Sequence, residues 1–193
     1  MSKHSTKKAY TANIGQLRAL ASPVRIEMVG VFQAHGPLAI RELAEKMSRP
    51  ADGLYHHVRQ LQMVGILRVA ETRRAGKRDE AIYELTAERF GHSAQPKTAA
   101  MRNAIVETAA SALRLANREF RRAVLADNAG RDEGRPRTKL SRQRTWLTDD
   151  DLIELHGMLD SIEAYLKERT GRRQGRPFAM TTVLVPLVKR KRI

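Results

Sequence analysis

The sequence predicts a mainly α-helical fold with a small β-hairpin, an α+β arrangement in which long helices follow an N-terminal domain. Three observations predict it. Apolar residues recur at helical spacing from residue 24 to residue 61, and the spacing changes to strand-like alternation over 66–71 and 80–85. It returns to helical spacing after residue 97. The polar segment 72–79 separates the two strands, so we expect it to form the tip of the hairpin.

Composition narrows the class of protein. The 193 residues are enough for one or two small domains, and the absence of cysteine excludes disulfides, thiolate metal sites and cysteine nucleophiles. No segment is apolar for long enough to span a membrane, and the polar first ten residues do not resemble a signal peptide, so we expect a cytoplasmic protein. The net charge of +15 indicates a polyanionic partner, nucleic acid before membrane.

The charge is unevenly distributed. Residues 172–193 carry seven basic and no acidic side chains, whereas residues 146–171 carry two basic and seven acidic ones. We therefore expect every basic segment to be able to approach phosphate, and the acidic helix within 146–171 to face away from it.

The N-terminal domain is predicted to span residues 11–92, after a disordered basic lead-in over 1–10. A short helix over 11–20 precedes Ser22-Pro23, an N-cap followed by proline in the first turn of the next helix. Two further amphipathic helices are expected over 40–47 and 51–64, the second ending at Gly65. The hairpin completes the domain.

The order helix, helix, turn, helix, strand, basic loop, strand is that of a winged helix-turn-helix, whose second paired helix enters the major groove of DNA. Burial of Leu54, Val58 and Leu61 would turn the opposite side of helix 51–64 outward. Arg59 suits guanine and Gln62 suits adenine, while Asp52 suits cytosine or repels phosphates. Contacts to the DNA backbone or the minor groove are predicted for six basic residues. Arg41 lies in the first paired helix and Arg49 in the turn after it, and the wing supplies the other four: Arg73, Arg74, Lys77 and Arg78.

About 70 residues, with motifs from residue 20 to residue 67, resemble the ArsR-type family of bacterial transcriptional regulators. The resemblance rests on the segments LASPVRI at 20–26, IRELA at 40–44, LYHHVRQL at 54–61 and VGIL at 64–67. It implies a homodimeric, repressor-like protein that binds an operator near a promoter. The positions that match the family's recognition-helix contacts are Asp52, Gly53, Tyr55, His56 and Arg59. The chain departs from the metal-sensing members because it contains no cysteine.

The region 97–170 is predicted to form two long helices around a flexible basic connector, residues 128–145. Two interpretations stay open. The apolar stripes suit a dimerisation unit built from Val106, Leu113, Phe120, Leu152, Leu155, Leu159, Ile162 and Leu166. The same helices could instead line a pocket for a small-molecule effector with Met101, Ile105, Trp146, Met158 and Tyr165.

The remaining motifs predict no cofactor, no metal and no catalytic site. His56 and His57 point about 100° apart on a helix and make a poor chelate. The sequence has no G-x-S-x-G, H-E-x-x-H or Walker motif, so we expect no enzyme. Residues 134–137 and 175–177 lack the first arginine of a minor-groove hook and are interpreted as basic linker. A C-terminal strand over 176–188 and a basic tail over 189–193 are expected.

Three functions compete at this point. The first is a dimeric, sequence-specific transcriptional regulator. The second is a non-specific architectural DNA-binding protein, which the net charge and the basic linkers also suit. The third is an effector or protein-interaction module that uses a winged domain as a docking surface.

Overall fold

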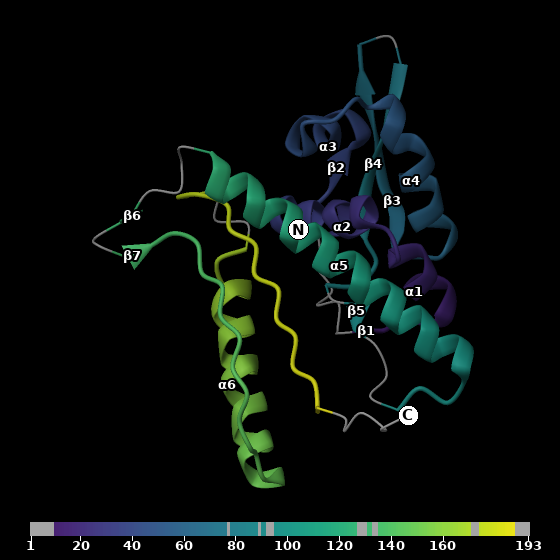
Figure 1. The fold of residues 1–193 in the computed structure, drawn as a ribbon. Coiled ribbons are helices and arrows are strands. Elements are labelled where there is room, and N and C mark those ends of the chain that lie inside the picture. Colours follow the sequence, from purple (N-terminus) through teal and green to yellow (C-terminus); the bar gives the residue numbers. More distant parts are fainter. Residues whose placement is uncertain are drawn as a thin grey trace.

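A computed structural model describes residues 10–76, 78–88, 90–91, 95–126, 131–132, 135–170 and 174–187. Six helices and a small three-stranded antiparallel sheet make up most of the described chain (Figure 1). The mainly helical fold class with a β-wing is confirmed. The lead-in over residues 1–9, the linker at 92–94, Lys77, the connector residues 128–130 and 133–134, and the tail 189–193 lie outside the described residues.

Four helices precede the wing: α1 (Ile14–Leu20), α2 (Pro23–His35), α3 (Ile40–Met47) and α4 (Asp52–Met63). Proline stands in the first turn of α2 as predicted, but the side chain of Ser22 makes no capping hydrogen bond. Proline has no N–H, so this helix start has one donor fewer to satisfy. Gly65 follows α4 with a φ of +71°, the left-handed conformation expected of a residue that ends a helix.

A single apolar core joins α2, α3, α4 and the start of the sheet. Met28, Leu43 and Leu61, one from each helix, and Ile66, which directly precedes the sheet, have no exposed surface. The side chain of Gln16 in α1 is also buried, and its Nε2 donates to the carbonyl of Val64 at 3.1 Å. These contacts fix α1 and α2 against α4.

The wing is longer than predicted. Strands β3 (Leu67–Ala75) and β4 (Arg78–Leu85) pair almost to the tip, and β2 (Leu38–Ala39) adds to β4, so the order is β2-β4-β3. Most of the segment 72–79 that was expected to be a loop is therefore strand, with the turn at Gly76. Opposite charges face each other across it, Arg73 against Glu80 and Arg74 against Asp79, which favours strand pairing without apolar alternation.

Helix α5 (Ala99–Leu125) crosses α1 and α2 (Figure 1). Ala104, Ser111 and Leu115 form its buried face, and the hydroxyl of Thr108 donates to the carbonyl of Leu17 at 2.8 Å. Short strands β1 (Tyr10–Thr11) and β5 (Phe90–Gly91) pair in parallel beside it. Helix α5 is thus part of the same packed unit as the winged domain.

Helix α6 (Asp149–Lys167) begins at the predicted capping box, in which Thr148 and Asp151 exchange hydrogen bonds. No residue of α6 is buried. The ammonium of Lys167 lies 2.6 Å from a carboxylate oxygen of Glu88, which ties the end of α6 to the segment after the sheet. No described helix is both long and apolar enough to cross a membrane.

Two expectations about the C-terminal half are wrong in detail. The connector contains a small hairpin, β6 (Arg131–Asp132) with β7 (Arg135–Pro136), where a structureless segment was expected. Residues 176–187 run extended beside α6 (Figure 1) and form no strand. Their alternating apolar pattern suits a strand, but a strand needs the edge of a neighbour, and Phe178 is 71% exposed.

Candidate nucleic-acid interface

Helix α4 presents one apolar and one polar face. Leu54, Val58 and Leu61 are at most 2% exposed, because they close the core against α2, α3 and the sheet. The residues predicted to contact bases all lie exposed on the rest of the helix surface: Asp52, Gly53, Tyr55, His56, Arg59 and Gln62. The structure thus brings these six residues together on one accessible surface. The base contacts themselves stay a prediction.

A shallow groove of about 510 Å³ runs along this polar face. Tyr55, His56, Arg59 and Gln62 line it from α4, and Ile40 and Tyr83 line it from α3 and β4. Gly53 lies at the start of the same helix, and a Cβ added there would meet no atom within 4 Å. The fold therefore does not require glycine at position 53, and its bare backbone leaves room for a ligand to approach closely.

His57 faces inward, toward α2. Its Nδ1 lies 3.4 Å from Nη1 of Arg25, whose Nε donates to the carbonyl of Ala19. A guanidinium can only donate, so Nδ1 of His57 accepts and carries no proton. Burial lowers the pKa of His57, and the positive charge of Arg25 lowers it further. His57 is therefore a neutral packing residue, as expected from its place at the edge of the apolar face.

We expect the protein to lose stability as the pH falls from 7.5 to 5, and His57 to be one cause. A lowered pKa means that the unfolded chain, whose histidine titrates near 6.5, binds the proton more readily than the folded one. The stabilisation is complete above pH 6.5 and is lost as the pH falls below it. Thermal unfolding across this range should depend less on pH in His57→Gln than in His56→Gln, which changes the exposed neighbour. Equal pH dependence in the two variants would contradict the assignment.

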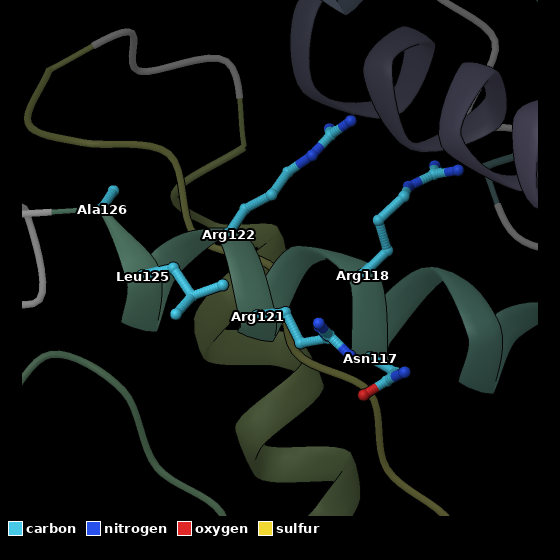
Figure 2. Close-up of a pocket in the computed structure, with 6 residues that line it drawn as sticks. All are labelled: Asn117, Arg118, Arg121, Arg122, Leu125 and Ala126. Atoms are coloured by element: carbon cyan, nitrogen blue, oxygen red, sulfur yellow. The ribbon is translucent and has the colours of Figure 1, made fainter.

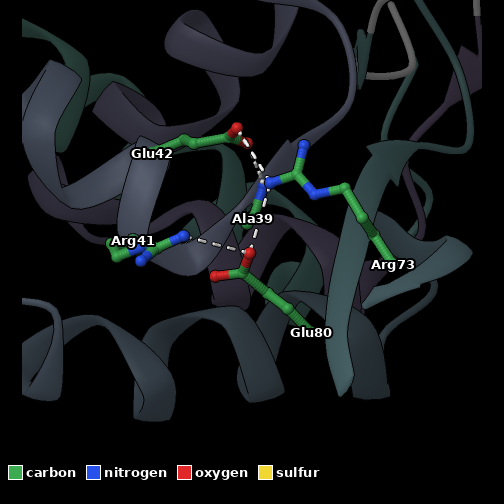
Figure 3. A network of polar contacts seen from close by, with 5 residues as sticks. All are labelled: Ala39, Arg41, Glu42, Arg73 and Glu80. Carbon is green, nitrogen blue, oxygen red and sulfur yellow. Dashed lines mark hydrogen bonds and ion pairs between the residues drawn. The ribbon is translucent and has the colours of Figure 1, made fainter. Parts of the chain in front are cut away.

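The wing arginines differ in the ion pairs that they form within the protein. Nη2 of Arg73 lies 3.0 Å from Glu42 in α3 and 3.2 Å from Glu80 in β4, and Nη2 of Arg41 lies 3.5 Å from Glu80 (Figure 3). Glu42 also accepts the backbone N–H of Ala39 at 2.8 Å, and this bond and Arg73 lower its pKa. Arg73 and Arg41 are therefore partly neutralised within the protein and hold the wing against α3.

Arg74 is exposed on the same strand, with no acidic partner among the ion pairs of the described residues. The backbone of Arg78 pairs with Ala75, and Lys77 lies outside the described residues. Among the described wing cations, Arg74 is the one most available to phosphate.

We expect Glu80→Gln to strengthen binding to DNA of any sequence. The substitution removes a negative charge from the wing, frees Arg41 from its ion pair, and leaves Arg73 paired with Glu42 alone. Each arginine that then reaches a phosphate should steepen the slope of log K against log salt by about one unit. Titrations of labelled duplex at several salt concentrations measure this slope. Glu84→Gln, which removes the ion pair with Arg68 near the base of the hairpin, is the matched control and should leave the slope unchanged.

Arg49 forms an ion pair within the protein. Its Nη2 lies 3.0 Å from Oε2 of Glu27 in α2, and Nη2 of Arg118 in α5 lies 2.8 Å from the same oxygen. The three side chains are at most one-third exposed. The turn before α4 is thereby linked to α5 through one carboxylate. Burial and the nearby charge of Glu27 raise the pKa of Glu119 on the same side of α5.

Sequence reasoning missed Arg25, Glu27 and Arg118. Glu27 lies 22 positions from Arg49 and 91 from Arg118. A charged residue on a predicted helix gives no signal that identifies so distant a partner. The one available hint was the position of Glu27 next to the apolar face of α2.

The residues predicted to dimerise lie on faces that the single chain leaves largely open. On α5, Val106 is 66% and Leu113 is 49% exposed, and Phe120 is half-buried. Those on α6 are likewise exposed or half-buried: Leu152, Leu155, Leu159, Ile162 and Leu166.

The residues of the alternative effector pocket are not brought together. Met101 and Ile105 pack against Ala12 and Leu17, whereas Trp146 is 98% exposed. The guanidinium of Arg169 stacks on the ring of Tyr165, 3.4 Å from its centroid. Within the described residues no group of three or more histidine and acidic side chains is arranged to hold a metal ion.

Comparison with known proteins agrees with this geometry. A family model described as a helix-turn-helix domain matches residues 20–70. The chain contains a helix-turn-helix DNA-binding domain. The match covers α2, α3, α4 and the start of β3, which form most of the core and most of the lining of the polar groove. The matched family is one of DNA-binding domains and not of enzymes. No curated protein matches the chain.

Proposed function

We propose that this chain is a sequence-specific transcriptional regulator that binds DNA as a homodimer and acts as a repressor. The exposed face of α4 carries the proposal, because six residues suited to base contacts share one accessible surface on a helix that the core holds rigidly. Two such helices, about 34–36 Å apart, would enter successive major grooves of a near-palindromic operator. A regulator of this kind acts in the cytoplasm of a bacterium.

The resemblance of residues 20–67 to ArsR-type regulators supports the repressor and dimer parts of the proposal. The helix-turn-helix match covers nearly the same residues. The absence of cysteine argues for a member that does not sense metals through thiolates.

We propose that the wing cations differ in how much they contribute to phosphate binding, because some of them are already paired with carboxylates of the protein. Arg74 contacts phosphate directly, and Lys77 and Arg78 are proposed, from the sequence alone, to add contacts to the backbone or the minor groove. Arg73 and Arg41 support the wing through Glu42 and Glu80 and contribute less to phosphate binding. Arg49 acts by positioning α4.

A non-specific architectural role is the second candidate, favoured by the net charge of +15. The two functions differ in what they do with random DNA. A non-specific protein binds every duplex with similar affinity, whereas a specific regulator of this size binds its operator about 10³–10⁷-fold more tightly than random sequence.

Random-site selection with the purified full chain at physiological salt tests the proposal. We expect an enriched motif with two related half-sites about 10 base pairs apart. Selection without any enriched motif, together with uniform gel shifts, would show the architectural function instead. If no DNA shifts even at low salt, the winged domain docks a protein and both DNA functions are wrong.

A further inference from the structure

Helix α6 and the outer face of α5 each carry an apolar stripe without a partner in the single chain. No residue of α6 is buried, although five leucine or isoleucine residues follow one another at heptad spacing from Leu152 to Leu166. A helix of this length draws most of its stability from packing such a stripe. The outer stripe of α5 runs from Val106 through Leu113 and Phe120 to Val124, opposite the face that packs on α1 and α2.

The two stripes match in length. Val106 and Val124 are 18 residues apart, which is about 27 Å along a helix, and the 19 residues of α6 span about 28 Å. One α6 therefore covers one outer stripe of α5 from end to end.

The two helices also carry opposite charges. Residues 149–167 include six acidic side chains and one lysine, whereas residues 113–125 include four arginines and one glutamate. Near the end of α5, Arg118 and Arg122 point toward the winged domain, while Arg121 and Asn117 lie on another side of the helix (Figure 2). Together with Leu125 and Ala126 these residues line a shallow hollow of about 600 Å³. Arg121 thus adds a positive charge beside the outer stripe.

Charge decides between the possible pairings. Two α5 helices face to face would bring two helices of net positive charge together, and two α6 helices would bring two helices of net negative charge together. Like charges across an interface disfavour such pairings, whereas α5 against α6 sets opposite charges side by side. The α6 of the same chain does not fulfil this role, because its stripe stays open and its end is tied to Glu88.

We propose that α6 of one copy packs along the outer face of α5 of a second copy, and that the reciprocal contact completes a two-fold dimer. This inference rests on the dimer of the proposed function and assigns its interface. The acidic helix then shields part of the arginine-rich end of α5, and the two winged domains remain free to face DNA.

The absence of cysteine makes the interface accessible to disulfide mapping in the full chain. Leu113→Cys is combined in turn with Leu155→Cys, Leu159→Cys or Ile162→Cys, which samples one helical turn on either side of the expected contact. Each single variant is the matched control. After mild oxidation we expect a covalent dimer in at least one double variant and little in any single variant, since only the double variants place two thiols across an α5–α6 contact.

Three results would overturn the inference. A covalent dimer of Leu113→Cys alone shows that α5 pairs with α5, and a fast-migrating monomer of a double variant shows that α6 folds back on its own α5. If the chain forms no covalent dimer and sediments as a monomer, the two apolar stripes bind some other protein and not a second copy. Random-site selection is independent of these results, so a regulator with a different interface would still select an operator.

A charge reversal gives a second measurement. Arg121→Glu should raise the dimer dissociation constant at least tenfold in sedimentation equilibrium, and high salt should reduce the difference. Lys139→Glu makes the same change of charge on an exposed residue of the connector and should leave the constant unchanged. An equal effect of the two substitutions would mean that net charge, and not the α5–α6 contact, governs association.

Discussion

Leu61→Ala should lower the free energy of unfolding of this protein by about 2–5 kcal/mol, the largest stability effect that we expect from a single substitution. Leu61 has no exposed surface and packs in the core that joins α2, α3, α4 and the sheet. The shorter side chain loses its burial and leaves a cavity that the surrounding helices cannot close. Urea unfolding followed by circular dichroism measures the change.

Gln62→Ala is the control for this prediction. Gln62 is the next residue along α4, but it is exposed in the groove. The substitution should change the free energy of unfolding by no more than about 0.5 kcal/mol. If the two variants unfold alike, α4 is not oriented as described, and the base-contact residues would have to be assigned again.

Arg59→Ala should weaken binding to the selected operator by about 1–3 kcal/mol and relax the base preference at one position of each half-site. Arg59 is exposed in the middle of the polar face of α4 and lines the groove, with no ion-pair partner among the described residues. Its guanidinium can therefore make a bidentate contact with guanine without breaking a contact inside the protein. Titration of the operator and of its single-base variants measures both effects.

Arg74→Ala is the comparison for Arg59→Ala. It should weaken binding to all sequences to a similar extent and reduce the salt slope by about one unit, because a phosphate contact carries no sequence information. A loss of base preference in Arg74→Ala, or a uniform loss in Arg59→Ala, would reverse the roles given to α4 and the wing.

The arrangement of the winged domain could be predicted from the sequence because its signals are local. Leu54, Val58 and Leu61 define the buried side of α4 by their spacing alone, and Gly65 marks the end of the helix. The same reasoning placed Thr148 and Asp151 at the start of α6. Each of these features depends on residues within one or two helical turns.

The parts that could not be predicted depend on distant partners. The length of the wing follows from charge pairs such as Arg73 with Glu80, which alternation of apolar residues does not register. Residues 176–187 have a strand-like pattern and form no strand, since a strand requires a neighbouring edge that the sequence cannot supply. The availability of a wing cation to DNA likewise depends on whether a carboxylate from α3 or β4 reaches it.

The carboxylate of Glu27 has a consequence for how substitutions combine. Its Oε2 pairs with Arg49 from the turn before α4 and with Arg118 from α5, so neither arginine makes an independent contribution to stability. Removing one leaves the other with the whole carboxylate, and the free-energy changes of Arg49→Ala and Arg118→Ala will not add in the double variant. This coupling energy joins the turn before α4, the helix proposed to read DNA, to α5, the helix proposed to hold the second copy. We therefore expect the proposed operator binding and the proposed association of two chains to be coupled by the same free energy in either direction.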